Sequence, residues 1–231
     1  MEMIYEGLVK AIELMLMLDP QVLEISWLTL KVSGTATFVS VLLGVPLGTY
    51  LALADFPGRR VIVSIVNFGM GLPPVVVGLW VSIFLWRSGP FGSLGIIYTP
   101  AAMIIAQAII AAPVVTSFTL ATMQQTSYKL RLQILALGAN RFQLLWYLLR
   151  EARLGLLSAI IAGFGAVVSE VGASMMVGGN ILGETRVLTT ATVMEVNKGN
   201  FELAIALSLV LLGLAYGVTL ILTLIQQRRT A

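Results

Sequence analysis

The chain has 231 residues, of which 58% are hydrophobic and 11% are charged, and its formal net charge is +3. Because an average globular chain contains roughly 25% charged residues, this composition excludes an ordinary soluble fold and indicates an integral membrane protein. The sequence contains no Cys and no His, which excludes disulfides, Cys- or His-based zinc sites and Ser-His-Asp triads. The small positive charge does not favour nucleic-acid binding, and no metal site is expected.

Residues 1–20 are expected to form an amphipathic helix that lies along the outer surface of the membrane. The apolar positions that share one helical face are Ile4, Leu8, Ala11, Ile12 and Met15. The alternative is a disordered extension. This segment is acidic and lacks the basic start and apolar core of a signal peptide, so we expect no cleavable leader.

Five later stretches are apolar and long enough to cross the roughly 30 Å hydrocarbon core as helices. The expected spans are 27–54, 61–86, 101–123, 154–177 and 203–226. They predict an all-α transmembrane domain that occupies the whole chain, residues 1–231. Pro73 and Pro74 interrupt the second span, where the missing backbone donor produces either a packing kink or a break that faces a cavity.

The distribution of basic residues between the loops predicts the orientation of the chain. One set of alternate loops carries nine Lys and Arg against two acids, and the opposite set carries five against eight acids. Because Lys and Arg collect on the cytoplasmic side, the N-terminus is expected outside and the C-terminus in the cytoplasm. We therefore expect a multi-pass protein of the plasma or inner membrane.

The basic segment 124–153 is too long for a simple connector and predicts two short helices joined by a glycine. The apolar face of the first helix consists of Leu130, Ile134 and Leu137. Gly138 is suited to end that helix, and Asn140 with Gln143 forms a capping box that starts the second. The exposed apolar surface of this elbow favours docking of a cytoplasmic protein, and the alternative is a hairpin that rests on the membrane without a partner.

The elbow also resembles a known element. Leu137-Gly138-Ala139, followed by Arg141-Phe142-Gln143, is similar to the cytoplasmic loop of ABC importer permeases. In that family the loop forms the coupling helix, which sits in a cleft of a separate ATPase subunit. The resemblance implies a coupling role for Gly138 and for its neighbours Leu137, Ala139, Asn140 and Arg141. The chain departs from the family pattern at Leu132-Gln133-Ile134, where Glu-Ala-Ala is expected, and at Arg150-Glu151, where Leu-Pro is expected.

Further motifs resemble molybdate and tungstate permeases over about residues 20 to 227. The first span and turn carry the motif residues 35–37, 44–48 and 56–60, and the second span carries residues 72–78. The motifs that look most like the tungstate branch are residues 169–174, 178–181 and 185–190. The resemblance implies the type I fold of ABC importer permeases and the import of an oxyanion, first of all tungstate. Molybdate or another oxyanion is the alternative.

The resemblance further implies the partners of the chain. We expect a homodimer with two cytoplasmic ATPase subunits and an extracytoplasmic oxyanion-binding protein. The sequence has no Walker-type GxxxxGK[ST] loop, so ATP and Mg²⁺ are expected on the ATPase subunits, with no cofactor and no enzymatic activity in this chain. The rival from another class is a secondary transporter that works without an ATPase, which usually needs several buried ionisable residues.

Candidate residues for the translocation path or its gate are Pro73, Pro74, Glu170, Ser174, Gly178, Gly179 and Asn180. Glu170 is the ionisable residue well inside a span, and its charge would repel an anionic substrate. We therefore expect Glu170 to pair with a cation, to bind neighbouring backbone amides or to close a gate. Contacts to the oxyanion are expected from the hydroxyl and backbone N–H groups of Ser174, Gly178, Gly179 and Asn180.

Two pairs of glycines have the spacing that lets membrane helices approach closely. They are Gly44 with Gly48 and Gly213 with Gly217. Helix packing is the expected role of both pairs.

Overall fold

The computed structural model describes residues 5–7, 9–10, 13 and 19–227, and these residues form helices and turns without any strand. The expected fold class, all-α, is therefore confirmed. The apolar face proposed for the N-terminal helix, which comprises Ile4, Leu8, Ala11, Ile12 and Met15, lies outside the described residues.

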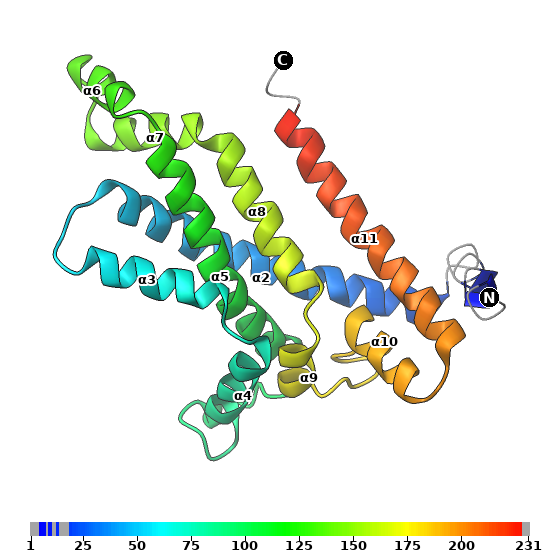
Figure 1. Cartoon of the computed structure of the whole chain (residues 1–231). Coiled ribbons are helices and arrows are strands. Elements are labelled where there is room, and N and C mark those ends of the chain that lie inside the picture. The colour runs from blue at the N-terminus through cyan, green and yellow to red at the C-terminus, as the bar shows by residue number, and fades with distance from the viewer. Residues whose placement is uncertain (1–4, 8, 11–12, 14–18, 228–231) are drawn as a thin grey trace.

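Ten α-helices and one short 3₁₀ helix follow one another from Pro20 to Gln227 in this part of the chain (Figure 1). They are α2 (Pro20–Leu53), α3 (Arg59–Met70), α4 (Pro74–Leu85), η1 (Gly92–Leu94), α5 (Pro100–Gln125), α6 (Tyr128–Ala136), α7 (Arg141–Glu151), α8 (Arg153–Val168), α9 (Gly172–Gly178), α10 (Leu188–Asn197) and α11 (Phe201–Gln227). In Figure 1, α6 and α7 lie at one end of the bundle, where α11 also ends, and α4 and α9 lie at the opposite end.

Three helices are long and apolar enough to cross a membrane alone, namely α2, α5 and α11. They overlap the expected spans 27–54, 101–123 and 203–226. The shortest, α5, has 26 residues and is therefore about 39 Å long, more than the hydrocarbon core requires. Asp19 fixes the start of α2, because its carboxylate accepts hydrogen bonds from the backbone N–H groups of Gln21 and Val22, each 3.0 Å long.

The other two expected spans are broken helices. The span 61–86 consists of α3 and α4, which are bent by 100° at the break between them. Each has 12 residues, about 18 Å, so a crossing here needs both helices. The span 154–177 consists of α8 and α9, separated at Ser169–Val171. A further helix, α10, lies between α9 and α11 and has no counterpart among the expected elements.

Helices α2 and α5 pack closely along their lengths because small residues separate them. A Cβ atom at Gly48 would lie 2.6 Å from the carbonyl oxygen of Thr116, and one at Gly44 would lie 2.9 Å from Val115. The packing role expected for Gly44 and Gly48 is therefore confirmed. A Cβ at Gly213 or Gly217 would meet no described atom within 4 Å, so this pair faces open space on α11.

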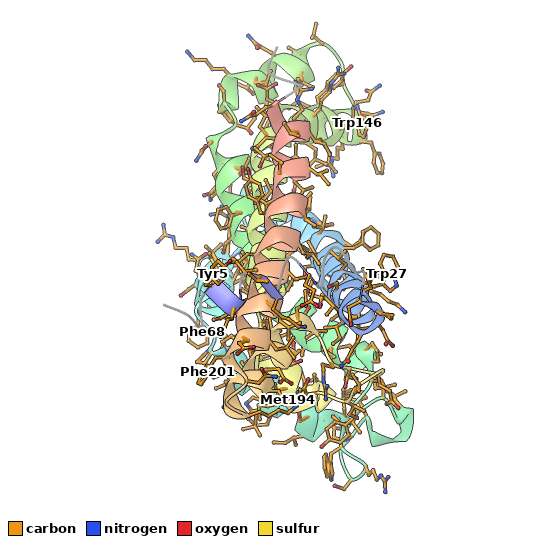
Figure 2. All side chains as sticks on the ribbon, turned by 90° about the vertical axis from the view of Figure 1, so that its right-hand side faces the viewer. Tyr5, Trp27, Phe68, Trp146, Met194 and Phe201 are labelled. Atoms are coloured by element: carbon orange, nitrogen blue, oxygen red, sulfur yellow. The ribbon has the colours of Figure 1, made fainter. Side chains whose placement is uncertain are left out.

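The main apolar core forms where α2, α4, α5 and α9 meet. Its largest members are Val32, Val77, Val81, Leu85, Met103, Val177 and Val187. Much apolar surface remains outside this core, and Figure 2 shows Trp27, Phe68 and Trp146 at the periphery of the molecule. Such a surface is unfavourable in water and suits contact with lipid or with other subunits.

Candidate coupling elbow and translocation residues

The first helix of the elbow, α6, ends in a Schellman motif centred on Gly138. The N–H of Gly138 donates to the carbonyl of Leu135 over 2.9 Å, and that of Ala139 donates to the carbonyl of Ile134 over 3.3 Å. Gly138 has φ of +82°, the left-handed conformation that L side chains rarely adopt. The backbone therefore favours glycine at this position, as the sequence predicted for the end of this helix.

The second helix of the elbow, α7, begins with the expected capping box. The side chain of Asn140 accepts a hydrogen bond from the N–H of Gln143, and the side chain of Gln143 accepts one from the N–H of Asn140, both over 2.9 Å. These two bonds satisfy backbone donors that the helix itself leaves free. The turn between α6 and α7 is thus held at both ends by local hydrogen bonds.

The tip of the elbow presents apolar side chains to its surroundings. Leu137 is 88% exposed and Phe142 is 85% exposed. Beside them lies a hollow of about 430 Å³, whose walls include Ile134, Leu137 and Tyr147. A tip with this composition offers apolar surface and a concavity for a partner protein.

A second set of side chains ties the elbow to the membrane helices. Leu144 and Leu148 of α7 form a buried cluster with Met123 of α5 and with Ala152 at the start of α8. Leu53, the last residue of α2, packs against the same cluster. A displacement of α7 would therefore be transmitted to the ends of α2, α5 and α8, since a close-packed cluster transmits strain.

Pro73 and Pro74 lie at the break between α3 and α4. The carbonyl of Pro73 accepts the first hydrogen bonds of α4, and Pro74 is the first residue of that helix. The N–H of the first residue of a helix has no hydrogen-bond partner within that helix. Proline, which lacks this N–H, can therefore start α4 without removing a helical hydrogen bond. Beyond them α4 packs against α9 so closely that a Cβ at Gly78 would lie 2.7 Å from the Cα of Ala173.

Glu170 lies at the second break, between α8 and α9, and is 7% exposed. Its carboxylate Oε1 accepts a hydrogen bond of 2.8 Å from the N–H of Ala173, in the first turn of α9. Its backbone carbonyl accepts a hydrogen bond of 2.9 Å from the hydroxyl of Thr189. The roles expected for Glu170 were pairing with a cation, binding a backbone amide and closing a gate. The structure shows the second of these, a hydrogen bond to a backbone amide.

Ser174 is buried on α9 and contacts a polar residue of α5. The side-chain Nε2 of Gln107 donates to the hydroxyl Oγ of Ser174 over 3.1 Å. The Oε1 atom of Gln107 is also buried, and none of the described residues provides it with a donor. An unsatisfied amide oxygen in an apolar bundle has a strong tendency to accept a hydrogen bond from water or from a ligand.

The remaining candidates form the turn that follows α9. Gly179 has φ of +71°, and its N–H donates to the carbonyl of Met175 over 2.9 Å. The carbonyl of Gly178 accepts the hydroxyl proton of Thr185, and the carbonyl of Asn180 accepts a bond of 3.3 Å from the guanidinium of Arg186. The carbonyl of Gly178 and the N–H of Gly179 are thus already engaged within the chain.

The structure brings the α9 candidates and the two prolines to the same end of the bundle, where α4 packs against α9, and places the elbow at the other end (Figure 1). Sequence reasoning missed Gln107, which bonds to Ser174. It placed Thr185 and Thr189 in a motif without assigning the contacts that they make to Gly178 and Glu170. A signal for Gln107 did exist, because a lone amide in an otherwise apolar span is costly unless it has a partner.

Residues 44–231 match the family described as the binding-protein-dependent transport system inner membrane component. The chain belongs to this family. It is 37% identical to a tungstate uptake system permease protein of Peptoclostridium acidaminophilum over 98% of this chain and all of that protein. It is 42% identical to a probable anion ABC transporter permease protein of Haloferax volcanii over 84% of this chain and 86% of that protein.

The fold of this inner membrane component is similar to that of solved ABC transporters. The superposition on an inward-facing MetNI methionine ABC transporter structure has a TM-score of 0.74 at 21% identity, and covers 90% of this chain and 95% of the other. At this identity the likeness concerns the fold alone. The chain has the all-helical fold of type I ABC importer permeases, as the sequence motifs predicted.

Proposed function

We propose that this chain is the permease subunit of an ABC importer for a small oxyanion, with tungstate as the first candidate substrate. The observation that supports this most directly is the 37% identity to a tungstate uptake permease over nearly the whole chain. Molybdate, or another tetrahedral oxyanion, is the second candidate, because a permease of this kind receives its substrate from a separate binding protein that sets the specificity.

The proposed assembly contains two copies of this chain, two cytoplasmic ATPase subunits that bind ATP and Mg²⁺, and an extracytoplasmic binding protein. The chain itself supplies no catalytic group. The excess of Lys and Arg on alternate loops supports an orientation with the elbow and the C-terminus in the cytoplasm and the N-terminus outside. In this orientation the α4–α9 end of the bundle faces the binding protein.

In the proposed mechanism the elbow receives the movement of the ATPase. Leu137, Gly138, Ala139 and Asn140 form the tip that enters the partner, and Arg141 begins the helix behind it. Movement of α7 acts on α8 through Leu148 and Ala152. Because α8 runs from the elbow to the break at Glu170, tilting α8 displaces α9 against α4 and α5 (Figure 1).

The contact of α9 with α4 and α5, which this movement displaces, is the proposed gate. Pro73 and Pro74 orient α4, Glu170 secures the first turn of α9, and the turn Gly178–Gly179–Asn180 closes its other end. Ser174, bonded to Gln107, lies between them in sequence and is the proposed polar contact for the passing anion. We assign Glu170 to holding α9 through the hydrogen bond that its side-chain oxygen accepts from Ala173, since a carboxylate in the path would repel a dianion.

The experiment that tests this function is reconstitution of the permease with its ATPase and binding protein in liposomes. We expect ATP hydrolysis and tungsten accumulation to rise when tungstate is added with the binding protein. Molybdate and sulfate serve as competing anions that rank the substrates. Accumulation without ATPase, driven by an ion gradient, would overturn the proposal in favour of a secondary transporter.

A further inference from the structure

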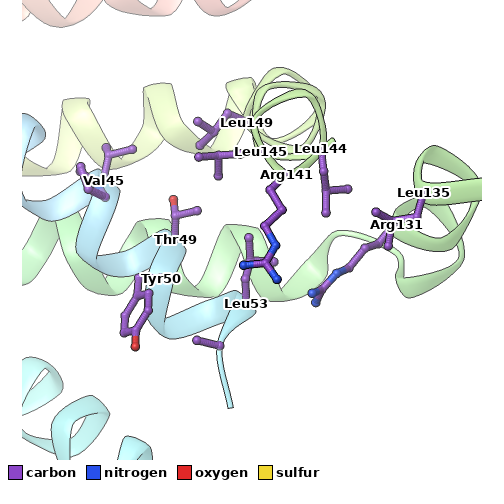
Figure 3. A pocket seen from close by; sticks show the side chains of 12 residues that line it. Val45, Thr49, Tyr50, Leu53, Arg131, Leu135, Arg141, Leu144, Leu145 and Leu149 are labelled. Carbon is purple, nitrogen blue, oxygen red and sulfur yellow. The ribbon is translucent and has the colours of Figure 1, made fainter. Parts of the chain in front are cut away.

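A cavity lies between the end of α2 and the coupling elbow. It has a volume of about 680 Å³ and is open on one side. Figure 3 shows its walls, which come from the last three turns of α2 and from α6 and α7. Arg141 is the one residue assigned to coupling that lines this cavity, and no residue of the proposed gate lines it, so those functions do not account for the space between α2 and the elbow.

Most of the cavity wall is aliphatic. Eight of the twelve lining side chains carry only carbon, namely Val45, Pro46, Leu53, Ala54, Leu135, Leu144, Leu145 and Leu149. A tetrahedral oxyanion is small and strongly hydrated, and such a wall would remove its water without replacing the hydrogen bonds. The volume and the lining instead suit a hydrocarbon chain, which gains free energy from contact with apolar side chains.

The remaining lining groups are suited to a phosphate ester. Arg131 of α6 and Arg141 of α7 both extend their guanidinium groups toward the end of α2 in Figure 3. No described carboxylate lies within ion-pair distance of either arginine. Two neighbouring guanidinium groups without an acidic partner favour an anion between them, because guanidinium binds phosphate oxygens in a bidentate manner.

A buried hydroxyl provides an independent observation. Thr49 lines the cavity and is 5% exposed, and its Oγ1 atom has no hydrogen-bond partner among the described residues. In Figure 3 this oxygen points from α2 toward Leu145 and Leu149, across the cavity. A buried hydroxyl without a partner is unfavourable, and a ligand oxygen that reached this wall of the cavity would satisfy it.

We propose that this cavity is a binding site for an anionic glycerophospholipid of the cytoplasmic leaflet. The phosphate lies between Arg131 and Arg141, the hydroxyl of Thr49 donates to a phosphate or ester oxygen, and an acyl chain lies against the leucines of α7. The site is at the end of a helix that is long and apolar enough to cross a membrane, and at the basic end of the bundle, where anionic headgroups gather. A bound lipid there fills the space between α2 and the elbow.

The test measures lipid retention by the purified permease–ATPase complex in native mass spectrometry. The complex is extracted from nanodiscs of phosphatidylcholine and phosphatidylglycerol in equal amounts. We expect selective retention of phosphatidylglycerol, and a reduction of about thirtyfold in its affinity in the double variant Arg131→Gln/Arg141→Gln. Thr49→Val, which removes the hydroxyl at nearly constant shape, is expected to weaken retention by a smaller factor.

The matched control is Arg60→Gln/Lys129→Gln, which removes the same charge from exposed positions at the same end of the chain but outside the cavity. It is expected to retain phosphatidylglycerol like the wild type. Equal loss in both double variants would reduce the effect to general surface charge and overturn the proposal. So would equal retention of the two lipids, or displacement of phosphatidylglycerol by inorganic phosphate, which would assign the site to a free anion.

A further outcome concerns the partner protein. If Arg131→Gln/Arg141→Gln releases the ATPase while phosphatidylglycerol retention stays at the wild-type level, the arginines bind the ATPase and the lipid proposal is wrong. Lipid retention does not depend on transport, so it can be measured even where tungstate uptake fails. The lipid site and the proposed function can therefore fail separately. Thermal unfolding of each variant shows whether it is folded.

Discussion

Gln107 of α5 and Ser174 of α9 form a side-chain hydrogen bond of 3.1 Å in the buried interior, 67 residues apart in the sequence. This bond joins a helix that is continuous across the bundle to a helix of seven residues beside the break at Glu170. It is therefore a link that the proposed gate would have to break or rearrange when α9 moves against α5.

A double-mutant cycle with Gln107→Leu and Ser174→Ala measures this link. Interhelical hydrogen bonds in membrane proteins contribute about 0.6 kcal/mol on average, and we expect a coupling free energy of that size from thermal unfolding in detergent. We also expect Gln107→Leu to lower transport clearly while it lowers thermal stability only slightly. It removes a buried oxygen that has no partner among the described residues as well as the hydrogen bond to Ser174. Strictly additive effects on both stability and transport would contradict this role.

Substitutions at Gly138 separate backbone conformation from contact with the partner. Gly138→Val should weaken the elbow, because the left-handed conformation costs a residue with a Cβ about 1–2 kcal/mol and β-branched residues more. Gly138→Asn should keep the turn, since Asn tolerates this conformation. We expect the ATPase to co-purify with Gly138→Asn and to be lost with Gly138→Val. Equal co-purification with both variants would show that the Schellman turn does not matter for docking.

Two substitutions of Glu170 distinguish the hydrogen bond from the charge. The side-chain oxygen of Gln can accept the bond from the N–H of Ala173, whereas Ala leaves that donor without this partner at a cost of about 1 kcal/mol. We therefore expect Glu170→Gln to transport nearly as the wild type does, and Glu170→Ala to lower both thermal stability and uptake. Loss of uptake in Glu170→Gln at normal stability would assign a gating role to the charge.

The two glycine pairs respond differently to the same substitution. Gly48→Val should destabilise the protein by about 1–3 kcal/mol or more, because its Cβ would collide with the backbone of α5. Gly213→Val places the same side chain in open space on α11 and should have little effect on the isolated permease subunit. Thermal unfolding compares the two variants. Similar losses of stability would mean that α2 and α5 are not packed as closely as described.

The sequence predicts the elbow well because its determinants are local. Gly138, Asn140 and Gln143 lie within six positions, and their backbone preferences and capping bonds need no distant partner. The three uninterrupted spans follow from composition for the same reason. The 100° bend at Pro73 could not be predicted from the sequence. Proline marks a possible break, but the angle depends on how α3 and α4 pack against α5 and α9.

Groups that meet only after folding could not be derived from local patterns. The partner of Ser174 is Gln107 on another helix, and the donor to the carbonyl of Glu170 is Thr189, 19 positions later. The cavity that joins Thr49 to Arg131 and Arg141 likewise depends on the packing of α2 against the elbow. The sequence indicates where these helices begin and end, but it does not indicate which side chains of different helices come into contact.

The most direct test of the proposed function is the amount of tungsten and molybdenum accumulated by cells that depend on this permease. Wild type and Gly138→Asp are compared at nanomolar supply of each oxyanion. We expect tungsten uptake in the wild type and its loss in the variant, because the negative charge that Asp introduces at the apolar elbow tip opposes docking of the ATPase. Unchanged accumulation of both metals in the variant would contradict the account, and the substrate would then be sought among other small solutes.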